Sequence, residues 1–201
     1  MKNSIRVAST FQRALPLLLI FLVPSLAQAH PGVPGHTHGF SNGLLHPLTG
    51  LDHICAMVAV GLWAAQRGGR ALWLVPTTFV SIIIVGGILG MGGSGIPYVE
   101  QGIAASVLVL GIFIAAAVRL PLVASAAIVG LFALFHGYAH GAEMPATASG
   151  LAYEIGFVIA TASLHLCGIS LGLIAQRFAS AKLIRFAGSV IAGSGVYLCF
   201  A

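Results

Sequence analysis

Residues 46–61 read HPLTGLDHICAMVAVG, and this stretch decides how the chain folds. Its second half is apolar enough to lie in lipid, yet its first eight residues include His46, Asp52 and His53. Ionisable side chains are costly in a membrane, tend to face the interior of a helix bundle, and usually mark a binding site or a pathway. The stretch therefore predicts a membrane helix that carries a functional site.

The composition of the whole chain agrees with a lipid environment. Hydrophobic residues make up 58% of the 201 residues and charged residues only 6%, whereas a soluble domain carries about a quarter charged residues. The 26 glycines suit close contacts between membrane helices. The nine Lys and Arg residues are spread along the chain without forming a basic patch, so we expect the lipid bilayer, and not nucleic acid, as a partner.

The N-terminus has the pattern of a signal peptide. A basic region (Lys2, Arg6, Arg13) precedes the apolar residues 15–26 and an Ala-Gln-Ala cleavage pattern at 27–29. We predict a cleaved segment 1–29, with an uncleaved first helix as the alternative. Residues 30–43 are rich in Pro and Gly, and we expect them to form an exposed periplasmic tail. Its histidines, His30, His36 and His38, either collect metal or belong to a solvated linker.

Six apolar segments follow, each close to the ~20 residues that a bilayer requires. We place them near residues 44–66, 71–91, 98–118, 121–140, 150–175 and 183–201. The predicted fold is all-α: a polytopic bundle of six transmembrane helices spanning residues 44–201 as one domain. The connections are short, so we expect sequence neighbours to pack together. The pattern is compatible with an oligomer.

The basic residues after the signal peptide fix the orientation of this bundle. With the mature N-terminus outside, the loops after the first, third and fifth spans should face the cytoplasm and carry the Lys and Arg residues. All six lie there: Arg67, Arg70, Arg119, Arg177, Lys182 and Arg185. We therefore predict a protein of the bacterial inner membrane with both mature termini in the periplasm.

The same topology gathers the acidic residues and most histidines at one depth. Four acids are present, Asp52, Glu100, Glu143 and Glu154, and each falls in the outer half of a predicted span or at its outer end. On an ideal helix His46 and His53 share a face, with Met57 one turn further. His136, His140 and Glu143 likewise share a face of the fourth span. Asp52 either completes a ligand set or holds an imidazole in place.

Imidazoles with carboxylates suit nickel, cobalt, zinc, copper or iron, and the sequence does not rank these metals. The predicted metal ligands are His46, Asp52, His53, His136, His140 and Glu143. Further candidates for a secondary site or pathway are Glu100, Glu154, His165 and Met57, together with the three tail histidines. Met57 has an ordinary packing role as its alternative. His165 lies three turns beyond Glu154, ~16 Å deeper in the bilayer.

Two stretches resemble the signatures of the HupE/UreJ family: HPLTGLDHICAMVAVGLWAA at 46–65 and FHGYAHGAEMP at 135–145. The resemblance extends from the signal peptide through all six spans. It implies a nickel or cobalt permease, linked with hydrogenase or urease, and not an enzyme. Ni²⁺ or Co²⁺ would then be a transported substrate, with no permanently bound cofactor.

The chain has no P-loop for nucleotide hydrolysis, so we expect secondary transport or facilitated diffusion. Two other classes stay open at this stage. An intramembrane serine protease would use Ser94 of the Gly-Gly-Ser-Gly turn at 92–95, and a Ser94→Ala variant would test it. A b-type haem protein would use two of the histidines as axial ligands, and an absorption spectrum would reveal it.

Overall fold

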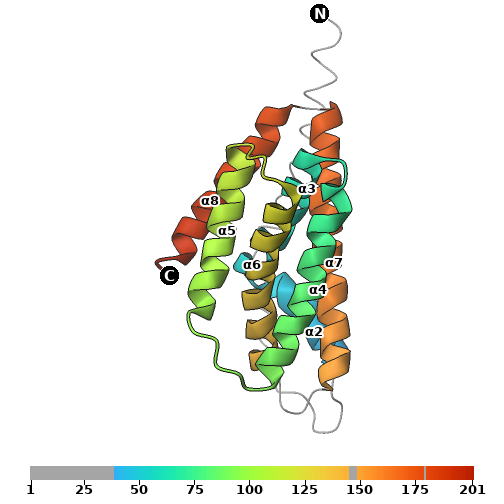
Figure 1. Ribbon diagram of the computed structural model, residues 1–201, viewed down its shortest axis with the longest axis vertical. Coiled ribbons are helices and arrows are strands. Elements are labelled where there is room, and N and C mark those ends of the chain that lie inside the picture. The colour runs from blue at the N-terminus through green and yellow to red at the C-terminus, as the bar shows by residue number, and fades with distance from the viewer. Residues whose placement is uncertain (1–38, 145–148, 179) are drawn as a thin grey trace, which may run out of the picture. The chain divides into compact units, whose positions relative to one another are not determined.

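The computed structural model describes residues 39–144, 149–178 and 180–201. The predictions for the signal peptide and for His30, His36 and His38 lie outside these residues. Every regular element in the described ranges is a helix, which confirms the all-α prediction (Figure 1). The helices are α2 (Gly39–Thr49), α3 (Leu51–Arg67), α4 (Ala71–Met91), α5 (Val99–Ala115), α6 (Leu122–Glu143), α7 (Gly150–Phe178) and α8 (Ala181–Leu198).

Most of these bounds follow the predicted segments closely, with one clear difference at the start. The predicted tail ended at residue 43, but α2 already includes residues 39–43. Gly39 and Gly43 are buried there, and a Cβ at Gly43 would overlap the carbonyl of Tyr153 on α7. These two glycines therefore allow α2 to lie directly against α7, which a solvated tail would not do.

The first predicted span is not one straight helix. It breaks at Gly50, where α2 and α3 meet at 81°. Pro47 lies inside α2 and lacks the backbone N–H that a continuous helix would use. Gly50 is extended, with φ −92° and ψ 126°, and its carbonyl accepts the Ile54 N–H at 3.1 Å to begin α3. The segment predicted as the first span is thus a bent pair of helices, with polar residues on both sides of the bend.

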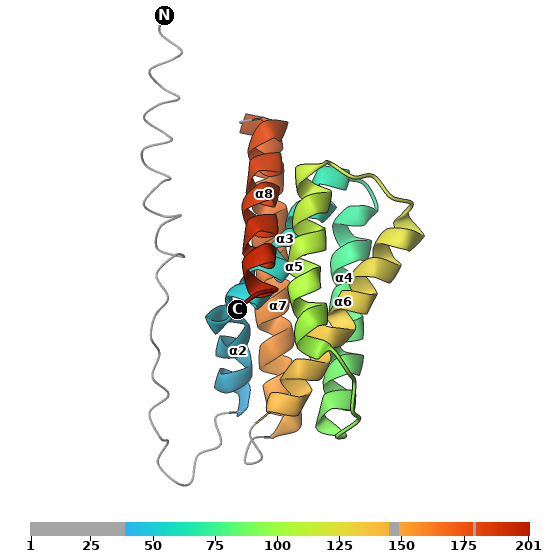
Figure 2. The same cartoon turned by 90° about the vertical axis from the view of Figure 1, so that its left-hand side faces the viewer.

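Helices that are neighbours in sequence are mostly not the closest neighbours in space, so the packing prediction is wrong. The most extensive contacts join α4 to α6, α5 to α8, and α3 and α2 to α7. Figure 2 shows α4 beside α6 and α5 beside α8. Several connections are short, yet each helix makes its most extensive contacts with a helix that is not next in sequence, so loop length does not decide the pairing.

Glycines explain which helices pair. A Cβ added at Gly137 on α6 would overlap the Ile83 carbonyl on α4. Gly61 on α3 and Gly168 on α7 approach each other in the same way, and Gly195 on α8 meets the backbone of Leu108 on α5. Since lipid tails are as apolar as the side chains, such close backbone contacts are a main source of helix association in a membrane.

The surface of the described helices is apolar, and large side chains such as Trp73, Val123 and Phe186 are more than half exposed. Among these helices α4, α6 and α7 are each long and apolar enough to cross a membrane, and the bent pair α2–α3 brings the number to four. The 17-residue α5 is apolar but shorter.

Candidate metal centre

The fourth predicted span, α6, holds two fully buried histidines. His136 and His140 are one helical turn apart and both have 0% exposure, as the four-residue spacing predicts. The adjacent residues Gly137 and Gly141 face α4. The two glycines pack α6 closely against α4. The two imidazoles point instead toward the bend between α2 and α3.

Two more histidines come from the two sides of the Gly50 bend. The centroid of the His53 ring on α3 lies 4.8 Å from that of His136 and 4.5 Å from that of His140. His46 on α2 lies 4.4 Å from His140. These ring contacts are edge-to-face, with interplanar angles of 73–88°. The four imidazoles, called here the histidine cluster, therefore form one continuous group.

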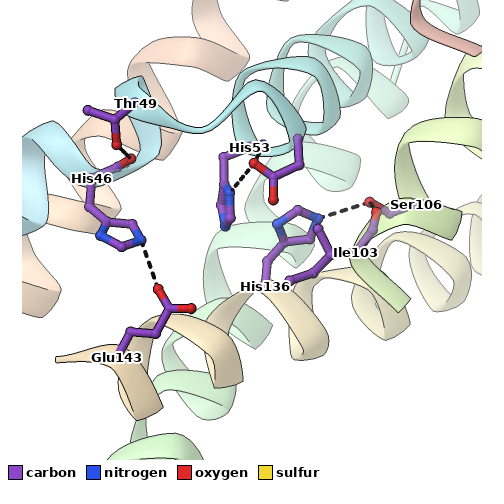
Figure 3. Close-up of polar contacts among 8 residues, drawn as sticks. His46, Thr49, His53, Ile103, Ser106, His136 and Glu143 are labelled. Carbon is purple, nitrogen blue, oxygen red and sulfur yellow. Dashed lines mark hydrogen bonds and ion pairs between the residues drawn. The ribbon is translucent and has the colours of Figure 1, made fainter. Parts of the chain in front are cut away.

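Carboxylates hold two members of the cluster. Asp52 Oδ1 lies 2.8 Å from His53 Nδ1 and also accepts the His53 backbone N–H at 2.8 Å. Glu143 Oε2 lies 3.3 Å from His46 Nε2. Both contacts are visible in Figure 3. All six predicted ligands thus lie within one region, because the bend returns His46 toward α6 and α6 remains helical as far as Glu143.

Ser106, which the sequence did not single out, contacts His136 of the cluster. Ser106 Oγ on α5 lies 2.9 Å from His136 Nε2, and both residues are fully buried. The sequence around it, IAASVLVLG at 103–111, has no pattern that distinguishes Ser106 from an ordinary helix-packing serine. Only the position of α5 against α6 reveals its role.

Several ring nitrogens of the cluster make no hydrogen bond to any described residue. They are His53 Nε2, His136 Nδ1 and both nitrogens of His140. Buried polar atoms in proteins nearly always have a partner, so four such nitrogens in one cluster are exceptional. The Phe157 ring is tilted by 46° against that of His140, with 3.5 Å between centroids. Met57, one of the secondary candidates, is fully buried in the core.

These nitrogens do not yet converge on one point. In the described part of the chain, no group of three or more His, Cys, Asp or Glu side chains has the arrangement of a preformed metal site. The rings contact one another instead. The cluster therefore offers the right donor atoms, and its rings would have to turn or separate before they bound one ion together.

The secondary candidates lie around this cluster. Glu100, Gln101 and Asp52 line a cavity of about 390 Å³, together with Cys199 near the end of α8. Asp52 therefore borders both this cavity and the histidine cluster. Glu154 is buried on α7, and its Oε2 atom lies 2.7 Å from the position that a Cβ at Gly87 of α4 would take.

His165 is buried deeper along α7 and is separated from the cluster. Phe79 on α4 contacts the rings of both His136 and His165, with centroid distances of 5.9 and 5.0 Å. Neither ring nitrogen of His165 is hydrogen-bonded to a residue in the described ranges. Ser94, the candidate nucleophile of a protease, is exposed in the loop after α4, away from the buried histidines.

The chain matches known proteins over most of its length. The family model described as HupE / UreJ protein matches residues 17–198. The protein named Protein HupE from Rhizobium leguminosarum bv. viciae is 43% identical over 190 residues, which cover 94% of this chain and 97% of the relative. No solved structure matches.

Proposed function

The chain belongs to the HupE/UreJ family, and on that premise we propose that it is a permease for a divalent transition metal. The proposed substrate is Ni²⁺ or Co²⁺, carried from the periplasm to the cytoplasm for the maturation of hydrogenase or urease. The observation that carries this proposal is the histidine cluster, four imidazoles with Asp52 and Glu143 in contact with two of them. Imidazole with carboxylate is a donor set suited to these metals.

The cavity beside Asp52 is the proposed route from the periplasm. A hydrated cation is attracted to carboxylates, and Glu100 and Asp52 both line this cavity. Asp52 is also bound to His53, so an ion that reaches it is already next to the cluster. There the imidazole nitrogens would replace water in the coordination shell of the ion. The proposed route thus runs from the acidic residues of the cavity, through Asp52, to the imidazole nitrogens of the cluster.

Binding requires the rings of the cluster to turn, since they now contact each other edge to face. Beyond the cluster, passage inward would go by Phe79 toward His165, the next buried imidazole. With no nucleotide-binding motif in the chain, the proposed mechanism is secondary transport or facilitated diffusion.

Six spans in the inner membrane, with both mature termini in the periplasm, complete the proposal. The bent pair α2–α3 would form the first span, and α4 to α8 the others. Basic side chains near the opposite end from the cluster support this orientation: Arg67 Nη1 donates to Ser125 Oγ at 2.5 Å, and Arg185 Nε donates to the Ala115 carbonyl at 2.7 Å. Basic residues favour the cytoplasmic side.

Uptake of radiolabelled nickel and cobalt tests the function directly. Bacterial cells that lack their own nickel importers would produce the chain or a His140→Ala variant, with equal amounts confirmed in the membrane. Ser189→Ala, an exposed site on α8, is the control variant. We expect uptake by the parent and the control and none by His140→Ala, with zinc and copper as competitors to rank the metals. Parent cells that take up no more than cells without the chain would refute the proposal.

A further inference from the structure

The contact between Ser106 and His136 determines which nitrogen of that imidazole carries the proton. A neutral imidazole has one N–H donor and one nitrogen with a free lone pair, and the partner of one nitrogen decides the role of the other. A metal ion binds only the nitrogen with the lone pair. The tautomer of His136 therefore decides which of its two nitrogens can be a ligand.

The hydrogen bonds of Ser106 favour one assignment. A serine hydroxyl has a single proton, and of the two contacts of Ser106 Oγ the one to the Ile103 carbonyl is shorter, at 2.6 Å against 2.9 Å to His136 Nε2. A carbonyl can only accept, so we assign the hydroxyl proton to this contact. Oγ then accepts from His136, which assigns the ring proton to Nε2 and the lone pair to Nδ1.

The Nδ1 atom of His136 is directed toward the cluster. The ring lies between Ser106 on one side and His53 on the other (Figure 3). Nδ1 is buried and has no hydrogen-bond partner among the described residues. The lone pair is thus presented where the neighbouring imidazoles are.

His53 shows the same arrangement with its nitrogens exchanged. Asp52 is an acceptor only when ionised, so His53 Nδ1 donates to it at 2.8 Å and Nε2 keeps the lone pair. That Nε2 atom is also buried without a partner in the part of the chain that the structure describes. One nitrogen of each ring is thus paired with an oxygen, of Asp52 for His53 and of Ser106 for His136. The other nitrogen of each ring has no partner, and the two ring centroids are 4.8 Å apart.

We propose that Ser106 is a positioning residue of the metal site, which holds His136 as the Nε2–H tautomer so that Nδ1 receives the ion. The inference rests on the proposed metal-binding function and adds α5 to the helices that build the site. Outer hydrogen-bond partners of this kind usually contribute 10- to 100-fold to metal affinity, because they fix the tautomer and orientation of the ligand.

Nickel titrations of three forms of the full chain in detergent, the parent, Ser106→Ala and Ser106→Thr, distinguish a positioning role of Ser106 from a packing role. Ser106→Ala removes only the oxygen that accepts from His136, and Ser106→Thr keeps the hydroxyl. We expect Ser106→Ala to weaken nickel binding by about 10- to 100-fold in a titration with nickel chloride. Ser106→Thr should bind within a few-fold of the parent.

The tautomer itself is read without metal, by nitrogen NMR of ¹⁵N-histidine-labelled protein at mildly alkaline pH. The His136 signals are identified by their loss in His136→Gln. We expect a proton on Nε2 and none on Nδ1 in the parent and in Ser106→Thr, and a mixture or the reverse in Ser106→Ala. A proton on Nδ1 in the parent, or an unchanged tautomer and affinity in Ser106→Ala, would overturn the assignment. Absence of nickel binding by the parent would instead refute the proposed function.

Discussion

At the scale of single residues, His53 has the most connections in the cluster. Its ring contacts those of His46, His136 and His140, and its Nδ1 atom is paired with Asp52. A packing histidine would satisfy both nitrogens, because a buried unpaired nitrogen costs free energy. The unpartnered Nε2 atom is therefore better explained as a ligand position than as part of the core.

We expect His53→Ala to abolish uptake at low metal concentration, and His38→Ala in the predicted tail to reduce it only modestly. His53 is enclosed, so no other side chain can take its place, whereas tail histidines can substitute for one another. A lost ligand worth roughly 2–3 kcal/mol weakens binding by about 30- to 150-fold. The measurement is the initial rate of nickel and cobalt uptake over a range of metal concentrations.

An Asn replacement serves as a second variant at the same site. Asn in place of His53 keeps a donor near the position of Nδ1 for Asp52 but provides no equivalent of Nε2. If the ligand role is correct, His53→Asn fails like His53→Ala although the contact with Asp52 is retained. Parent-like uptake by both variants, at equal amounts in the membrane, would show that His53 is a packing residue.

Residue types and spacing were sufficient to predict all six candidate ligands, because His136, His140 and Glu143 follow a helical period and His46, Asp52 and His53 interrupt an apolar segment. Whether they bind metal stays a prediction. Ser106 was not predictable in this way, since a single serine in an apolar helix is common and its function depends on which helix packs against it. The hydrophobic period of a helix does not show which distant helix it contacts.

At the scale of elements, the bend at Gly50 builds one side of the site. A straight helix over 44–66 would also place His46 and His53 on one face, but it would separate them by about 10 Å along the axis. The bend brings their ring centroids to 6.1 Å. The prediction of a continuous first span was wrong because the extended backbone of Gly50 ends α2, and a new helix begins from the Gly50 carbonyl.

Gly50→Ala should damage the site and leave the fold intact. The backbone at Gly50 has φ −92°, which alanine adopts easily, so the change creates no backbone strain. Its new Cβ would lie 2.5 Å from Asp52 Oδ1 and 3.0 Å from His53 Nδ1, and must displace that pair. We expect nickel affinity to fall about 10-fold or more, with the thermal unfolding midpoint in detergent within a few degrees of the parent.

Gly193→Ala is the matched control for this prediction, because a Cβ at that position of α8 meets no atom within 4 Å. It should leave nickel affinity unchanged. If Gly50→Ala binds nickel as tightly as Gly193→Ala does, the orientation of the Asp52–His53 pair is unimportant for the metal.

At the scale of the whole described bundle, the two ends differ in chemistry. The histidine cluster and the acid-lined cavity occupy one end. The other end is held by side chains bound to backbone carbonyls: Gln66 Nε2 donates to the Ile114 carbonyl at 3.0 Å, and Trp63 Nε1 donates to the Val118 carbonyl at 3.2 Å. Arg67 lies over the Trp63 ring at 5.6 Å.

Two helices are weak points of the six-span topology: α8 is not among the helices apolar enough to qualify as a span, and α5 is short. Its 17 residues give a helix of about 26 Å, shorter than the ~30 Å hydrocarbon core. A bilayer adapts to such a mismatch by local thinning at a cost of fractions of a kcal/mol per Å. Since α5 packs closely on α8 and α6, we expect it to cross the membrane with them.

Reporter fusions decide the topology. With six spans and the mature N-terminus outside, Ala201 is periplasmic, so alkaline phosphatase fused there should be active and green fluorescent protein dark. Fusion after Arg119, between α5 and α6, should give the opposite pair of results, because an odd number of spans precedes it and its basic residue favours the cytoplasm. A fluorescent, phosphatase-inactive fusion at Ala201 would mean an odd number of spans. The Arg119 fusion would then locate the error. If that fusion were still cytoplasmic, the miscounted span would lie after α5. If it were periplasmic, the miscounted span would be the bent pair α2–α3, α4 or α5.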